Sequence, residues 1–155
     1  NIFGTTGGVA EASLRTVKEE LTGEPLERLN LGFEGINEAE IEIGDETVNV
    51  AIANGLGNAS EILDEVREGN SKYDFIEIMA CPYGCVGGGG QPIPATDERK
   101  QSRGEGLKNI DGAKTIRKSH ENPEVLKLYE EYLGEPLSGE SHHLLHTRYK
   151  ERERN

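Results

Sequence analysis

A strand–turn–helix–strand pattern between residues 47 and 79 constrains the fold of this chain more than any other feature. Residues 47–53 form a β-rich run that ends in an Asn-Gly-Leu-Gly turn, and residues 59–66 follow with apolar side chains at helical spacing. Residues 75–79 (FIEIM) predict a second strand. Because two strands joined through a helix normally lie parallel in one sheet, the pattern predicts an α/β body.

Further elements are expected on both sides of this unit. Residues 39–43 (AEIEI) alternate like a strand, and a Gly/Thr loop at residues 3–8 leads into an amphipathic helix that ends at Gly23. Strand signals stop beyond Pro94, and helices are expected at 96–108, 123–133 and 141–150. The second of these helices carries an apolar stripe that should pack on the α/β body, made of Val125, Leu126, Tyr129 and Leu133. We therefore expect an α/β body followed by a helical tail.

The charge distribution excludes some classes of partner. The 155 residues carry 17 Lys and Arg against 29 Asp and Glu, for a net charge of −12. Residues 1–95 hold 17 of the acidic but only 5 of the basic side chains. An acidic body repels phosphate backbones, which disfavours nucleic acid as a partner. No run approaches the roughly 18 consecutive apolar residues of a membrane span, so no membrane partner is expected.

Two cysteines in residues 79–92 (MACPYGCVGGGGQP) are the strongest chemical signal. Cys81 and Cys85 directly follow a strand, where α/β folds place ligand sites. The glycines Gly87, Gly88, Gly89 and Gly90 would let the backbone approach a bulky cofactor and aim N–H groups at anionic sulfurs. The first residues show no secretory leader pattern, so we expect a reducing, cytoplasmic compartment. Metal or cluster ligation is favoured there over a disulfide, or over two buried thiols beside a glycine-rich turn.

This motif resembles that of the [FeFe]-hydrogenases, and other segments share the resemblance over nearly the whole chain. Residues 3–15 (FGTTGGVAEASLR) and 73–77 (YDFIE) are similar to the segments that precede the motif in that family. Residues 117–123 (RKSHENP) and 143–147 (HLLHT) resemble the small-subunit segment that is fused to many members. The resemblance implies that residues 1–108 form the C-terminal lobe of a two-lobed catalytic domain. It also implies that residues 109–155 form a helical, small-subunit-like tail.

The family resemblance implies a cofactor and roles for particular residues. The cofactor is the H-cluster, a [4Fe-4S] cubane joined through a cysteine sulfur to a diiron unit, and the reaction is the interconversion of H2 with protons and electrons. Cys81 then corresponds to a cysteine that binds the cubane alone, and Cys85 to the cysteine that bridges the two parts. Met79 and Phe3 correspond to residues that line the diiron pocket, with ordinary core packing as the alternative for both.

The chain also departs from the family pattern. Tyr83 stands where the family usually has glycine, and we expect its side chain at the outer face of the loop. Only the last of three cysteine motifs is present, so the other cluster cysteines and the proton path are expected upstream of Asn1. The implied partners are the N-terminal half of the catalytic domain, and either ferredoxin or NAD(P)H-linked electron-transfer subunits. This oxygen-sensitive, anaerobic enzyme would need its complete chain, and the present residues alone are expected to be inactive.

Three alternatives remain at this point. Hydrogenase-like proteins that are not catalytic serve iron–sulfur assembly or protein interaction, although the tail segments resemble bacterial hydrogenases more closely. The turn at Gly55, Gly57 and Ser60, with Asp74 or Glu77 beyond it, loosely matches a dinucleotide-binding fingerprint. His142 and His146 could share a helix face and bind zinc, although packing or capping is the favoured interpretation.

Overall fold

The computed structural model describes residues 2–26, 28–29, 31–32 and 34–150. Contacts divide the chain into two compact units, residues 1–117 and 118–155, each of which is described by itself. The lobe boundary expected after residue 108 falls within helix α3 (Asp97–Gly112) and stays a prediction, whereas the division into compact units follows Arg117. Within the described ranges, no helix is both long enough and apolar enough to cross a membrane.

The first long helix, α1 (Gly8–Thr22), has a glycine at each end. Gly7 precedes it with a φ of 76°, and Gly23 ends it with a φ of 73° while its N–H donates to the Glu19 carbonyl (2.7 Å). Glycine adopts this left-handed conformation at little cost, and a left-handed residue after the last turn is a common helix stop. The helix predicted to end at Gly23 is confirmed.

One mixed sheet of three strands forms the centre of the first unit, in the order β1-β2-β3. Strands β1 (Ile36–Ile43) and β2 (Glu46–Asn54) are antiparallel and joined by a two-residue turn at Gly44. Helix α2 (Leu56–Glu68) connects β2 to β3 (Phe75–Met79), which lie parallel with Val50 opposite Phe75. The predicted parallel pair is confirmed, and β1 begins three residues earlier than expected.

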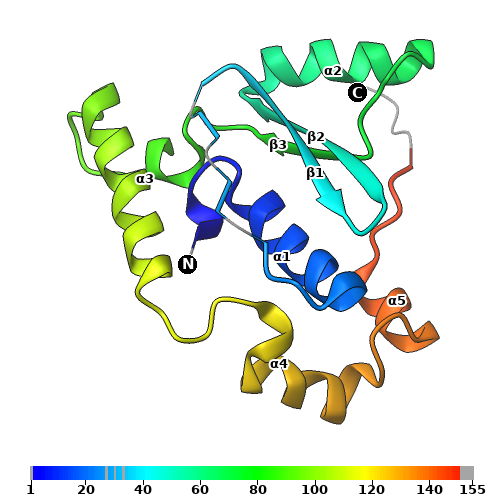
Figure 1. The fold of residues 1–155 in the computed structure, drawn as a ribbon. Coiled ribbons are helices and arrows are strands. Elements are labelled where there is room, and N and C mark those ends of the chain that lie inside the picture. Colours follow the sequence, from blue (N-terminus) through cyan, green and yellow to red (C-terminus); the bar gives the residue numbers. More distant parts are fainter. Residues whose placement is uncertain (1, 27, 30, 33, 151–155) are drawn as a thin grey trace. The chain divides into compact units, whose positions relative to one another are not determined.

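The core occupies both faces of β2. Figure 1 shows α1 and α2 on opposite sides of the sheet. Successive β2 side chains alternate between the two helices, because side chains of a strand point to opposite faces. The α1 face buries Val50 and Ile52 with Ala10, Leu14, Ile41 and Ile43, and the α2 face buries Ala51 and Ala53 with Ala59 and Ile62. A strand buried on both faces makes the carboxyl end of β2 a rigid platform.

A buried ion network links α1 to the end of α3. The Arg15 guanidinium pairs with Glu11 on its own helix and with Asp111 on α3 (2.8 Å). Arg117 also donates to Asp111 (3.1 and 3.2 Å), and its carbonyl accepts from Arg15 (3.2 Å). Burial alone would raise the pKa of Asp111, but the two guanidinium groups outweigh it and hold that pKa below its ordinary value. The network therefore fixes a helix with few apolar residues to the first unit.

Over residues 118–150, the second unit contains two short α-helices. Helix α4 (Pro123–Leu128) begins with proline at its first position, and the Asn122 side chain accepts from the Glu124 amide (3.0 Å). The chain continues as a π-helical turn, Tyr129–Leu133. Helix α5 (Gly139–Leu145) follows, and the Ser138 hydroxyl accepts from the Ser141 amide (3.2 Å). The helix predicted over 123–133 is thus present, with a wider last turn.

Two expectations about this unit need correction. The last helix was expected over 141–150, but it begins at the Ser138 cap and ends at Leu145, because His146 is extended (ψ 119°). Of the expected apolar stripe, Leu133 is buried, Val125 and Tyr129 are half-buried, and Leu126 is 54% exposed.

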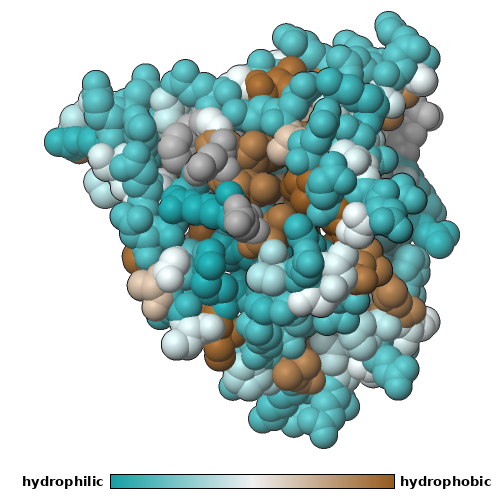
Figure 2. All heavy atoms as spheres, viewed as in Figure 1, coloured by the Kyte–Doolittle hydropathy of each residue, from teal (hydrophilic) through white to brown (hydrophobic). Residues whose placement is uncertain are grey.

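Figure 2 shows one mostly hydrophilic face of the molecule with smaller groups of apolar side chains among the polar ones.

Candidate functional site

The cysteine loop begins where two parallel strands end. Met79, the last residue of β3, lies opposite Asn54, the last residue of β2. The Met79 carbonyl accepts from the Gly55 amide (2.7 Å), so the turn into α2 is attached to the start of the loop. The carboxyl ends of parallel strands are where open α/β sheets place ligands. Cys81 and Cys85 therefore follow the sheet at the edge expected from the sequence.

Two tight turns shape the loop. Tyr83 and Gly84 have left-handed backbone (φ 68° and 80°), and a 3-10 turn follows over Gly84–Gly87. The Gly84 amide donates to the Cys81 carbonyl (2.9 Å), and the Gly88 amide donates to the Cys85 carbonyl (3.0 Å). Both cysteines are free and exposed. The loop thus presents two accessible thiols from consecutive turns, each with its carbonyl held inside the loop.

The four glycines differ in the space around them. A Cβ on Gly87 would lie 2.1 Å from the Pro82 carbonyl oxygen, and one on Gly88 would lie 3.2 Å from the Cys85 carbonyl oxygen. A Cβ on Gly89 or Gly90 would meet nothing within 4 Å. Gly87 is therefore required for closure of the loop itself. Only Gly89 and Gly90 leave open space for the close approach that the sequence suggested for all four.

The N-terminal segment forms a second wall beside the loop. The Thr6 amide donates to the Tyr83 carbonyl (3.3 Å), and a Cβ on Gly84 would lie 3.0 Å from the Gly4 oxygen. A Cβ on Gly4 would lie 4.0 Å from the Cys85 Cβ. The first turn of the chain, Ile2–Gly4, therefore lies against the cysteine loop, as the blue and green segments in Figure 1 show.

The sequence suggested that the Tyr83 side chain lies at the outer face of the loop, but the structure places it elsewhere. Its side chain is buried (7% exposed), and its hydroxyl donates to the Glu34 carboxylate. The Lys100 ammonium of α3 lies 5.1 Å from the centre of the tyrosine ring. The hydrogen bond to Glu34 raises the pKa of Tyr83 to about 12. The ring therefore connects the loop to two segments that are distant from it in sequence.

The remaining sequence-predicted site residues lie around the same loop. Met79 is half-buried at the strand end, whereas Phe3 is 55% exposed and therefore does not belong to the core. No group of three or more His, Cys, Asp or Glu side chains able to hold a metal occurs in the part of the chain that the structure describes. The local donor set is two thiols, and thiolates are the ligands of iron–sulfur clusters. The residues present therefore fit part of such a cluster.

Comparison with known protein families identifies the family to which the chain with this loop belongs. Residues 1–89 match the family described as "Iron only hydrogenase large subunit, C-terminal domain", and residues 97–152 match "Iron hydrogenase small subunit". The chain belongs to the iron-only hydrogenase family. The resemblance proposed from the cysteine motif and the tail segments is confirmed, in the same order along the chain.

Relatives and solved hydrogenases agree with this assignment. The chain is 48% identical to the NADP-reducing hydrogenase subunit HndD of Solidesulfovibrio fructosivorans, covering 99% of the chain and 27% of that protein. It is 42% identical to iron hydrogenase 1 of Clostridium pasteurianum, covering 96% of the chain and 28% of that protein. The structure of [FeFe]-hydrogenase HydA1 from Chlamydomonas reinhardtii matches with a TM-score of 0.75 at 44% identity. The match covers 95% of this chain and 45% of that chain. The α/β fold expected for the family is confirmed, and the chain spans about a quarter of the length of the first two hydrogenases.

The chain also matches relatives that are not named as hydrogenases. The chain is 33% identical to protein NAR1 of Arabidopsis thaliana, covering 96% of the chain and 33% of that protein. It is 29% identical to the cytosolic Fe-S cluster assembly factor narfl of Xenopus tropicalis. Membership in the family therefore leaves both the hydrogenase and the assembly interpretation open.

The dinucleotide interpretation depends on an acidic residue that could bind a ribose. Glu77 is buried, and its two oxygens accept from the Gly7 and Ala10 amides (2.7 and 2.6 Å). Asp74 accepts from the Asn49 amide (2.9 Å). Both carboxylates are therefore engaged in contacts within the fold. The role of Glu77 was not anticipated from the sequence, although a charged residue within the apolar run FIEIM was the available signal.

Two histidines of the tail, His142 and His146, lie together without a further metal-ligating group beside them among the described residues. His142 and His146 stack with their ring centroids 4.6 Å apart, and both are exposed. Among residues 34–150, the structure has no third metal-ligating group beside them. Their packing into a core is not observed either.

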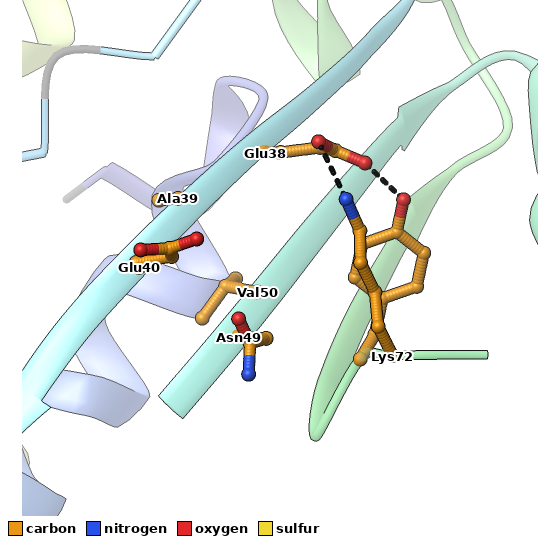
Figure 3. A pocket seen from close by; sticks show the side chains of 7 residues that line it. Glu38, Ala39, Glu40, Asn49, Val50 and Lys72 are labelled. Atoms are coloured by element: carbon orange, nitrogen blue, oxygen red, sulfur yellow. Dashed lines mark hydrogen bonds and ion pairs between the residues drawn. The ribbon is translucent and has the colours of Figure 1, made fainter. Parts of the chain in front are cut away.

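A separate pocket of about 380 Å³ lies between β1, the middle of β2 and the segment before β3. Figure 3 shows Glu38 directed toward Lys72 and the neighbouring tyrosine. Glu38 binds the Lys72 ammonium (3.1 Å) and accepts from the Tyr73 hydroxyl, and this hydrogen bond raises the pKa of Tyr73 to about 12. Glu38 and Lys72 pair with one another there, and the pocket contains none of the sequence-predicted site residues.

Proposed function

We propose that this chain is the cysteine-bearing C-terminal part of an [FeFe]-hydrogenase that oxidises H2 reversibly to two protons and two electrons. The observation that carries the proposal is the loop that presents the free thiols of Cys81 and Cys85 at the carboxyl ends of two parallel strands. The hydrogenase relatives named above, which match almost the whole chain, support the same function.

In this proposal the two thiolates would hold part of the H-cluster, Cys81 as a ligand of the cubane and Cys85 as the ligand shared with the diiron unit. When bound, the cluster supplies the redox chemistry on hydrogen. The protein supplies the thiolates, and the apolar side chains of Met79 and Phe3 restrict water around the diiron unit. Gly89 and Gly90 leave room for the cluster, and nearby backbone N–H groups stabilise its anionic sulfurs.

Two thiolates cannot complete the ligand set of a cubane, which normally takes four. The remaining ligands and the proton path are proposed to come from the N-terminal half of the catalytic domain, lying against residues 81–92. Electrons would pass to ferredoxin or to NAD(P)H-linked subunits. A cytoplasmic location remains a prediction, because the relatives include both a periplasmic hydrogenase large subunit and cytosolic assembly factors.

Cysteine variants of the complete hydrogenase test this function. We expect Cys85→Ala to abolish hydrogen evolution from reduced viologen, because the diiron unit loses its bridging thiolate. Cys81→Ala should also lower the iron content, because the cubane loses a ligand. Ser102→Ala, on the exposed surface of α3, is the control and should keep wild-type iron and activity. Near-normal hydrogen evolution by a cluster-loaded Cys85→Ala protein would contradict the proposal.

The present 155 residues alone make a second test. After anaerobic reconstitution with iron and sulfide, we expect labile or substoichiometric iron and no hydrogen evolution. Stoichiometric cubane with sustained hydrogen production would show that the expected ligand count is wrong.

Iron–sulfur assembly is the second candidate function, favoured by the match to the cytosolic Fe-S cluster assembly factor narfl over 94% of the chain. Both candidates predict that the complete protein binds an iron–sulfur cluster. They differ in turnover, since an assembly factor would hold its cluster without evolving hydrogen. The activity measurement on the complete wild-type protein therefore decides between them.

A further inference from the structure

We infer that Glu77 is the positioning residue that holds both walls of the cysteine site in register. The inference rests on the proposed function for its relevance to the cluster, and on the hydrogen bonds of Glu77 for its geometry. Glu77 lies in the middle of β3, only 6% exposed, with Ile52 of β2 opposite it. Ile52 belongs to the core face that packs against α1, so the Glu77 carboxylate lies beneath the start of that helix.

The carboxylate replaces a missing helix cap. The residue before α1 is Gly7, which has no side chain to accept hydrogen bonds from the first turn. One Glu77 oxygen accepts from the Gly7 amide (2.7 Å), and the other accepts from the Ala10 amide (2.6 Å). Ala10 is the third residue of the helix, the position that an ordinary capping side chain serves. Negative charge is also stabilised at a helix N-terminus, and hydrogen bonds to an ionised acceptor are the stronger kind.

This cap connects segments that carry different parts of the site. On one side, β3 runs from Glu77 through Met79 directly into the loop with Cys81. On the other side, Gly7 follows Thr6, whose amide donates to the Tyr83 carbonyl in the middle of that loop (3.3 Å). One buried carboxylate therefore fixes the N-terminal wall to the strand that carries the cysteines. A shift at Gly7 would be transmitted to the contact between Thr6 and Tyr83.

The substitution Glu77→Gln tests this role with minimal change of shape. Glutamine keeps one acceptor oxygen, but its NH2 group faces an amide donor, so one of the two bonds is lost. The control is Ile62→Val, a core change on the α2 face of the sheet, where no contact with residues 2–10 is described. Both variants remove buried interactions, but only one touches the cap.

Amide hydrogen exchange on the 155-residue chain is the first measurement. We expect Glu77→Gln to accelerate exchange at Gly7, Ala10 and Thr6 by about tenfold, the effect of losing one buried hydrogen bond. Ile62→Val should leave the ratio of Thr6 exchange to global exchange unchanged. Acceleration at Gly7 and Ala10 without any change at Thr6 would show that Glu77 only caps α1, and would overturn the inference.

Wild-type exchange keeps the inference testable if the glutamine variant does not fold. Coupled walls require that Thr6, Gly7 and Ala10 open together, with similar protection factors. Protection of Gly7 and Ala10 that exceeds protection of Thr6 by a hundredfold would overturn the coupling.

The complete hydrogenase supplies the second readout, the rate at which the iron–sulfur absorption is lost in a chelator. Glu77→Gln should lose its cluster at least tenfold faster than Ile62→Val, and an equal rate would argue against positioning. A wild-type protein that binds no cluster would contradict the proposed function, while the exchange result would still decide the role of Glu77.

Discussion

Gly87 and Gly89 belong to the same run of four glycines, yet they have different surroundings. A Cβ on Gly87 would collide with the Pro82 carbonyl oxygen at 2.1 Å, because the loop folds back on itself there. The same atom on Gly89 would point into open space. The fold therefore requires glycine at position 87. At position 89, glycine is required only if a cofactor approaches the loop closely.

Alanine substitutions separate these two requirements. We expect Gly87→Ala to disorder the cysteine loop, since the colliding atom belongs to the backbone and cannot move aside alone. Gly89→Ala should leave the loop unchanged without the cluster and lower iron retention in the complete protein. The rate at which a thiol reagent modifies Cys85 measures loop order in both variants. Equal rates in Gly87→Ala and the wild type would refute the steric argument.

At the scale of elements, the contact between α1 and α3 depends on charges. Asp111 accepts from Arg15 and Arg117 in a buried position, whereas α3 contributes few apolar side chains. Removing one member of a buried ionic group leaves the partner charge without compensation, which costs more than the pair contributes. The attachment of α3 should therefore be sensitive to single substitutions and to pH.

Asp111→Asn should lower the free energy of unfolding at pH 7 by roughly 3 kcal/mol, at the low end for a broken buried pair because Glu11 still neutralises Arg15. Since folding lowers the pKa of Asp111 below its reference of 3.8, its contribution is present above that pH. The contribution is lost as the pH falls through the folded pKa, so the difference between variant and wild type should shrink below about pH 4. Urea unfolding between pH 3 and 7 measures this trend.

The control for Asp111→Asn is Asp64→Asn, which removes an exposed ion pair with Arg67. The Arg67 side chain is 71% exposed and the Asp64 side chain is 58% exposed. Exposed pairs contribute about 0–1 kcal/mol, so this variant should stay close to wild type at every pH. A pH-independent loss in Asp111→Asn would show that the carboxylate charge is not what holds the helices.

At the scale of the whole molecule, the division after Arg117 identifies where the first unit ends. Arg117 closes the ion network on Asp111, and its carbonyl accepts from Arg15. A boundary inside α3 would remove part of that network. The first unit therefore includes the segment that follows α3 as well as the helix itself.

Two truncations compare these boundaries directly. A chain of residues 1–118 keeps both Arg117 contacts, and a chain of residues 1–114 loses them. We expect the shorter chain to be less stable by roughly 1.5–3 kcal/mol, the range for a hydrogen bond that involves a charged group. Thermal unfolding of the two chains at equal concentration measures the difference. Identical midpoints would mean that Arg117 contributes nothing to the first unit.

Much of the fold was predictable because its signals are local. Apolar periodicity and glycine stops identified α1, α2, β2 and β3, and the order of these elements implied the parallel pair. Local signals failed where the ends of elements depend on specific caps, as at Ser138 and His146 in the last helix. They also missed the burial of Tyr83, because its partner Glu34 lies 49 residues away in the chain.

The sequence by itself determined the family and the α/β class, and it located the two thiols of Cys81 and Cys85. These properties follow from the periodicity of apolar side chains and from a motif within fourteen residues. Only the tertiary structure decided which glycine closes the loop and that Glu77 caps α1 across 70 residues of chain. The physical reason is that steric contact and capping depend on how distant backbone segments pack, and a local pattern does not encode that packing.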